Sequence, residues 1–147
     1  MILQTNPSAA PTAYLFPGAD RTAERTDPAE QTELSVIRFV QKLGIRPHLT
    51  GYRLLISTIR LALDKPELQD SLTQALYPAV ARLHSCSVSA VERNIRKAIE
   101  SAYDTDPERI HAVFYFRVKK PYVSEVISTA IETIRLETSG TVPAGIF

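Results

Sequence analysis

The sequence predicts an all-α fold, with one helical domain between flexible ends, from three observations. Between residues 27 and 137 apolar residues recur at helical spacing, and no alternation of the strand type recurs. Proline and capping residues stand where these segments begin or end. Apolar residues, 44% of the 147, suffice for the core of one small domain. We therefore expect a disordered tail at residues 1–26, a helical domain at 27–137 and a flexible end at 138–147.

The first two predicted helices each carry an apolar stripe. The first begins near Asp27, with Pro28 in its first helical position, and ends at Gly44. The second runs from about Gly51 to Leu63, after a turn that contains proline. The expected inward positions are Leu34, Ile37, Val40 and Leu43 in the first helix, and Tyr52, Leu55, Ile56, Ile59 and Leu63 in the second.

Two shorter helices follow in the prediction. Asp64-Lys65-Pro66 ends the second helix and begins a third, which continues to about Leu76. Pro78 begins a short fourth helix, and Tyr77 before it is expected to be a core aromatic. The inward positions of this fourth helix are expected to be Val80, Ala81 and Leu83.

A longer fifth helix is predicted at residues 87–103, after a polar break at Ser85–Ser87. Ser87 is its expected N-cap, because the hydroxyl can accept a hydrogen bond from a free amide of the first turn. Its inward residues are expected to be Val91, Ile95, Ala98 and Ala102, and its outward residues Ser89, Glu92, Arg93, Arg96 and Glu100. A short helix, a break and a longer helix at residues 78–103 are the order of a helix-turn-helix.

The remaining chain predicts two more helices. Asp104–Pro107 interrupts the helical pattern, and a short helix is expected near Glu108–Phe114. Val113–Val118 has strand propensity, but it is too isolated to build a sheet, so we expect a helix end followed by a loop. The last helix opens at Ser124, and its inward positions are Val126, Ile127, Ala130, Ile131 and Ile134.

The outward face of the fifth helix carries side chains suited to reading DNA. In a helix-turn-helix the second helix enters the major groove. Arg93 and Arg96 share one helical face, and their guanidinium groups match the O6/N7 pair of guanine, while Glu92 can accept from the amino group of cytosine. Ser89 and Lys97 are better placed for phosphate. A solvated helix with ordinary charge pairs is the alternative that this segment alone leaves open.

The distribution of charge suits a nucleic-acid partner better than the net charge of +1 suggests. Through residue 33 there are five acidic and two basic residues, a net charge of −3. The rest of the chain has fifteen basic and eleven acidic residues, a net charge of +4. The part expected to fold is therefore moderately basic.

Other features argue against several classes of protein. The lone Cys86 excludes an internal disulfide and a cysteine-cluster metal site, and we expect it to pack as a small apolar residue. His48, His84 and His111 are too scattered to predict a metal site. No Gly-rich phosphate loop or paired carboxylates appear, so we expect no enzyme and no cofactor. Without a signal peptide or membrane-spanning run, the sequence predicts a cytoplasmic protein.

Four elements of the chain, in order and at compatible spacing, resemble one family. They are a His-Leu-x-Gly-Tyr element at His48–Tyr52, Leu-Tyr-Pro at Leu76–Pro78, Val-Glu-Arg-x-Ile-Arg-x-Ala-Ile-Glu at Val91–Glu100 and Lys-Pro-x-x-Ser-Glu at Lys120–Glu125. Together they resemble the C-terminal DNA-binding domain of the sporulation response regulator, stage 0 sporulation protein A. The resemblance covers about residues 34–137.

This resemblance implies a six-helix domain of the response-regulator effector type, related to winged helices. It also implies a transcription regulator that binds short repeated promoter boxes on double-stranded DNA, as a homodimer or tandem pair. A contact with RNA polymerase sigma factor is implied around Asp104–Ile110. The DNA-binding positions carried over are Glu92, Arg93 and Arg96 for base reading, and Lys119 and Lys120 for the backbone.

The chain also departs from the family pattern. Family members usually carry a receiver domain with a phosphorylated aspartate and a divalent-cation site, and the roughly thirty residues before the first helix are too few for one. We therefore expect neither phosphorylation control nor receiver-based metal binding. Ala90 stands where the family often has arginine, which removes one expected DNA contact. The alternative function is an interaction protein, without a receiver, that modulates a full-length relative or RNA polymerase by protein contacts.

Overall fold

The computed structural model describes residues 27–114 and 119–139. The chain divides into two compact units, Met1–Gln31 and Thr32–Phe147, and the packing described below is that of the second. The predictions for the tail at 1–26, for the loop at 115–118 and for the end from residue 140 lie outside the described residues.

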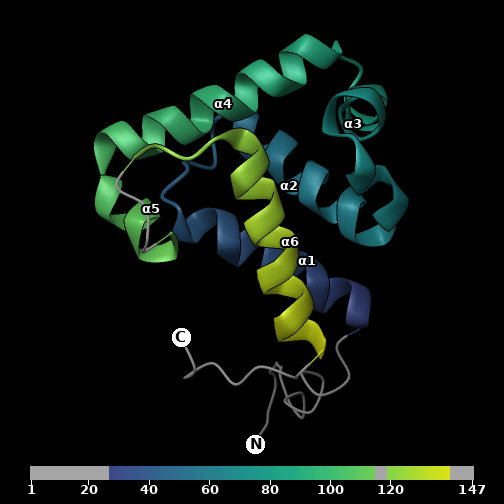
Figure 1. Ribbon diagram of the computed structural model, residues 1–147, viewed down its shortest axis with the longest axis horizontal. Coiled ribbons are helices and arrows are strands. Elements are labelled where there is room, and N and C mark those ends of the chain that lie inside the picture. The colour runs from purple at the N-terminus through teal and green to yellow at the C-terminus, as the bar shows by residue number, and fades with distance from the viewer. Residues whose placement is uncertain (1–26, 115–118, 140–147) are drawn as a thin grey trace, which may run out of the picture. The chain divides into compact units, whose positions relative to one another are not determined.

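Six α-helices form the described structure, and the two described ranges contain no strand, so the prediction of an all-α fold is confirmed. The α-helices are α1 (Pro28–Lys42), α2 (Thr50–Asp64), α3 (Tyr77–Leu83), α4 (Val88–Thr105), α5 (Pro107–Val113) and α6 (Val123–Ser139). Figure 1 shows α4 running from α3 at its N-terminal end to α5 at its C-terminal end. The second helix packs against both α4 and α6, and is therefore the centre of the fold.

The core is aliphatic and comes from nearly every helix. Its largest fully buried side chains are Leu43, Leu55, Ile59, Leu76, Ile95, Ile99, Ile110, Ile127, Ile134, Val36, Val40 and Val80. The absence of tryptophan and the scarcity of other aromatics, 7% of the chain, explain why leucine, isoleucine and valine fill this space.

A close approach between α2 and α4 depends on Gly51. A Cβ atom built on Gly51 would lie 2.2 Å from the carbonyl oxygen of Asn94 and 2.6 Å from the Cβ of Ala98. Both distances are far below van der Waals contact, so a side chain at this position would push the two helices apart. The glycine of the His-Leu-x-Gly-Tyr element therefore sets how closely α4 lies on α2.

The prediction of a third continuous α-helix, from Asp64-Lys65-Pro66 to about Leu76, is wrong. Pro66–Asp70 forms a 3-10 helix, η3, and Leu72–Leu76 forms a π-helical turn, η4, that runs directly into α3. Ser71 between them is extended, with φ −148° and ψ 111°, and its side chain accepts a hydrogen bond from the amide of Gln74. A serine that caps the following turn competes with continuation of the preceding one, so the segment breaks there.

Several boundaries and faces also differ from the prediction. The buried side of α1 is Ser35, Val36, Phe39 and Val40 rather than the side that includes Leu34, which is 48% exposed. Leu83, expected to face inward, is 66% exposed because α3 ends at this residue. The last helix continues through Ser139, two residues past the predicted end at 137. Among the helices that the structure describes, none has the length and apolar character to cross a membrane.

Candidate nucleic-acid interface

The turn between α3 and α4 is fixed by backbone and side-chain hydrogen bonds. The amide of Cys86 donates to the carbonyl of Ala81 at 3.0 Å, and Ser85 adopts a left-handed conformation with φ 53°. His84 Nε2 lies 2.7 Å from Ser57 Oγ, which ties the turn to α2. Cys86 is exposed, so the expectation that it packs as a small apolar residue is wrong.

Ser87 caps α4 as the sequence predicts. Its Oγ accepts a hydrogen bond from the amide of Ala90 at 3.1 Å, and its backbone is extended, as an N-cap requires. Ser89 in the same turn is exposed, and its hydroxyl lies 3.3 Å from that of Ser87. Two hydroxyl groups and the free amides of the first turn therefore gather where α4 begins.

The two faces of α4 differ sharply in burial. The predicted inward residues Val91, Ile95, Ala98 and Ala102 are all buried, and Ile99 joins them. On the other side Arg93, Arg96 and Lys97 are exposed, and Glu92 and Glu100 are partly exposed. The sequence-predicted residues of α4 thus lie together on an accessible, mainly basic surface.

The structure pairs Glu92 with Arg96 on this surface. Arg96 Nη1 donates to Glu92 Oε1, one helical turn away, and the two side chains are 44% and 40% exposed. This hydrogen bond and the charge of Glu92 raise the pKa of the Arg96 guanidinium above its ordinary value. The sequence predicts that Arg93 and Arg96 share one helical face; within the described part of the chain, Arg93 and Lys97 form no ion pair.

Tyr77, from α3, is buried. Its exposed fraction is 4%, which confirms the prediction of a core aromatic. Burial and, to a smaller extent, the negative charge of Glu92 raise the pKa of Tyr77 to about 12.

Lys119 and Lys120 precede α6, and both are exposed. Lys120 Nζ lies 4.0 Å from Asp104 Oδ1 and 5.8 Å from the centre of the Tyr103 ring, which meets the ring of His111 edge-on. Helical periodicity does not predict this cluster, because the fold joins residues that are 16 positions apart in the sequence. Lys120 is consequently held beside the C-terminal end of α4.

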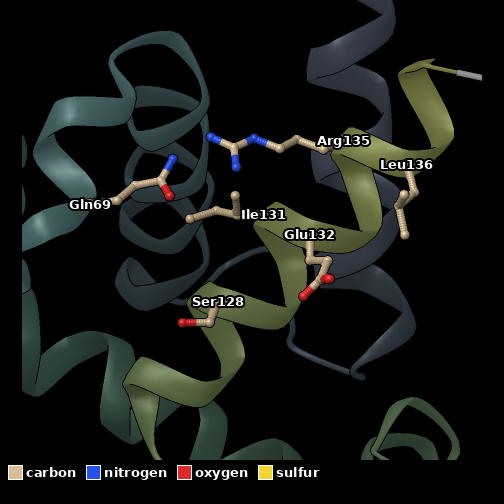
Figure 2. Close-up of a pocket in the computed structure, with 6 residues that line it drawn as sticks. All are labelled: Gln69, Ser128, Ile131, Glu132, Arg135 and Leu136. Carbon is tan, nitrogen blue, oxygen red and sulfur yellow. The ribbon is translucent and has the colours of Figure 1, made fainter.

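A shallow groove of about 430 Å³ lies between η3 and α6, and none of its lining residues comes from α4. Figure 2 shows the Gln69 side chain extending from η3 towards Arg135, with Ile131 between them. The lining residues are Gln69, Ser128, Ile131, Glu132, Arg135 and Leu136. The sequence does not predict this groove, because the residues of η3 are expected to belong to a regular helix.

The three histidines do not form a metal site. His48 is exposed at the start of α2, His84 bonds to Ser57, and His111 packs against Tyr103. In residues 27–114 and 119–139, no three His, Cys, Asp or Glu side chains are grouped so that they could hold a metal ion.

Comparison with models of known protein families identifies the family that this chain matches. The family model described as "Sporulation initiation factor Spo0A C terminal" matches residues 36–134. That span is 99 of the 147 residues, and includes α2 to α5, the C-terminal part of α1 and most of α6. It also includes every residue of α4 and both lysines before α6.

Proposed function

The chain belongs to the family of the sporulation initiation factor Spo0A C-terminal domain, a DNA-binding effector domain of a sporulation regulator, and we propose that it reads promoter sequences through α4. The observation that carries the proposal is the accessible face of α4, with Arg93, Arg96 and Lys97 exposed opposite a fully buried stripe. A helix braced in this way can enter the major groove without uncovering its core. The family is one of regulatory DNA-binding domains and not of enzymes.

The residues of the face divide by chemistry. Arg93 and Arg96 can each donate two hydrogen bonds to guanine, and Glu92 can accept from the amino group of cytosine. Ser89 and Lys97 lie where α4 meets the walls of the groove and would contact phosphate, helped by the free amides of the first turn. Through these contacts α4 would both read the base sequence and position the domain on the DNA backbone.

The lysines before α6 would add backbone contacts. Lys120 is paired with Asp104 at 4.0 Å, with side-chain exposures of 39% and 72%. An exposed ion pair of this length contributes little stability, so Lys120 can exchange the carboxylate for a phosphate group at small cost. Lys119 is exposed beside it and would bind the backbone in the same way.

Two further partners form part of the proposal. We infer that two copies bind together, as a homodimer or tandem pair, because repeated promoter boxes would place one domain on each box. The segment Asp104–Ile110 would contact RNA polymerase sigma factor. Three charged residues at the junction of α4 and α5 are exposed to solvent: Asp104, Glu108 and Arg109.

A DNA-selection experiment on the purified protein at two salt concentrations tests the proposal. We expect one motif to be enriched at both concentrations, with an affinity that falls as salt rises. A protein that is helical by circular dichroism and enriches no motif would contradict sequence-specific reading. Binding that depends steeply on salt, without an enriched motif, would show backbone contact alone.

The groove between η3 and α6 favours a second candidate function (Figure 2). In this alternative the chain modulates a full-length relative or RNA polymerase by protein contacts. Arg96→Ala would then leave activity intact, whereas Arg135→Glu, an exposed change in the groove, would abolish it. Under the DNA-reading proposal, Arg96→Ala removes one base preference.

A further inference from the structure

We propose that Glu92 determines specificity through Arg96: its carboxylate fixes the arginine over the base that the arginine reads, so the pair acts as one unit. The inference rests on the proposed function and deepens it. Glu92 would be a positioning residue for Arg96 in addition to any base contact of its own. Changing Glu92 would therefore alter the preference at the base position that belongs to Arg96.

The geometry of the pair leaves both side chains able to bind DNA. The bond joins Arg96 Nη1 to Glu92 Oε1. A guanidinium group has five N–H donors and a carboxylate has two oxygens, so most of the hydrogen-bonding capacity remains free. Arg96 can direct its remaining donors at guanine while Glu92 still holds it from the preceding turn.

Pairing of Arg96 with Glu92 in the free protein lowers the entropy cost of binding DNA. An arginine side chain loses much rotamer freedom when it is fixed on a base. An arginine already held by a carboxylate has lost part of that freedom in the unbound protein, so less is lost on binding. The same restraint narrows the positions that the guanidinium can reach, which makes it less tolerant of a wrong base.

The charge of Glu92 also acts on Tyr77 of α3, which is 4% exposed and whose pKa this charge helps to raise. Glu92 itself is only partly exposed.

Glu100 provides a matched control on the same helix. It lies four residues after Arg96, as Glu92 lies four residues before it, and its charge also acts on Arg96. The hydrogen bond, however, is formed with Glu92. An acid that precedes its basic partner by four residues is the more favourable order in a helix. Removing either glutamate changes the net charge by the same amount.

The test compares base preferences of the full chain and of three variants, Glu92→Ala, Glu100→Ala and Arg96→Ala. We first identify the base position that Arg96→Ala relaxes, where the loss of preference should be about 5- to 150-fold. Glu92→Ala is expected to lower the preference at that same position by roughly threefold or more, and Glu100→Ala to leave it unchanged. The double variant Glu92→Ala/Arg96→Ala should show no further loss there.

A measurement without DNA tests the pairing itself. In the free protein, NMR of the arginine side chains should show slower rotation of the Arg96 guanidinium than of Arg93, which has no such partner among residues 27–114 and 119–139. Glu92→Ala should remove the difference, and Glu100→Ala should preserve it. Equal rotation of the two arginines in the wild-type protein would overturn the proposal.

The outcomes separate this inference from the function on which it rests. A wild-type protein that enriches no motif contradicts both the sequence reading and the inference. A wild-type motif in which Glu92→Ala changes only a different position, or Glu100→Ala changes the Arg96 position equally, overturns the coupling and leaves the proposed function standing.

Discussion

Replacing Gly51 with alanine should destabilise the domain by forcing α2 away from α4. The added Cβ would lie 2.2 Å from the carbonyl oxygen of Asn94 and 2.6 Å from the Cβ of Ala98. Ordinary contacts between such atoms are longer by about 1 Å or more, so one helix must move by a comparable distance. Neither neighbour is the end of a flexible side chain, and local relaxation therefore gives little relief.

The size of this effect follows from two opposing contributions. Overpacking a core commonly costs about 1–3 kcal/mol, and a clash with backbone belongs at the upper end of that range. Alanine gains about 1 kcal/mol over glycine inside a helix, and less in the first turn, where Gly51 lies. We therefore expect a net loss of about 2 kcal/mol in the free energy of unfolding.

Urea unfolding followed by circular dichroism measures this loss. Arg53→Ala, two residues along the same helix and exposed, is the control, and should change stability by less than about 0.5 kcal/mol. The helix shift should also weaken specific DNA binding by Gly51→Ala under conditions where the variant remains folded. A Gly51→Ala protein as stable as the wild type, or more stable, would refute the proposed close packing of α2 and α4.

Three further predictions address the cap, the buried tyrosine and the basic loop. Ser87→Ala should lower stability by about 1 kcal/mol in urea unfolding, because the amide of Ala90 loses its acceptor. Ser87→Asn should keep most of that stability, because asparagine is also a good N-cap. Equal stability of the two variants would contradict the cap. Tyr77 has its pKa raised from 10.0 to about 12, so the folded state holds this proton more tightly than the unfolded state does. The contribution of Tyr77 to stability should be complete below pH 10 and be lost as the pH rises towards 12. Tyr77→Phe should remove that part of the pH dependence. If the variant has the same pH dependence as the wild type, the prediction for Tyr77 is wrong. Lys119→Ala should reduce the slope of log affinity against log salt by about 0.9 without changing the enriched motif, whereas an altered motif would show that the lysine reads bases.

Local features of the sequence were enough to predict α4. The cap at Ser87 and the inward positions Val91 and Ile95 depend only on neighbours within one or two turns, and both predictions are confirmed. The spacing of Glu92 and Arg96 was also visible in the sequence. The pairing of Arg96 with Glu92 was not predicted, although an acid four residues before its basic partner is the favoured order in a helix, because the bond forms only where the side-chain geometry allows it.

Features that depend on tertiary contacts were predicted less well. The break at Ser71 accompanies a hydrogen bond from Gln69 Nε2 to the carbonyl of Ala62, at 2.8 Å, which couples η3 to the end of α2. Lys120 meets Asp104 although α5 separates the two residues in the sequence. Leu83 and Cys86 are exposed because α3 ends before a full apolar face is complete. Helical periodicity contains no information on any of these contacts.

The link between His84 and Ser57 has a consequence for how base preference and docking angle can change. It attaches the start of the α3–α4 turn to α2, and Gly51 attaches the middle of α4 to the same helix. The direction in which α4 points is thereby set by a helix that carries none of the proposed base-reading residues. Substitutions on the outward face of α4 can therefore exchange one target sequence for another while the docking angle of the domain on DNA stays the same. Substitutions in α2 can change the docking angle while the base-reading residues stay the same.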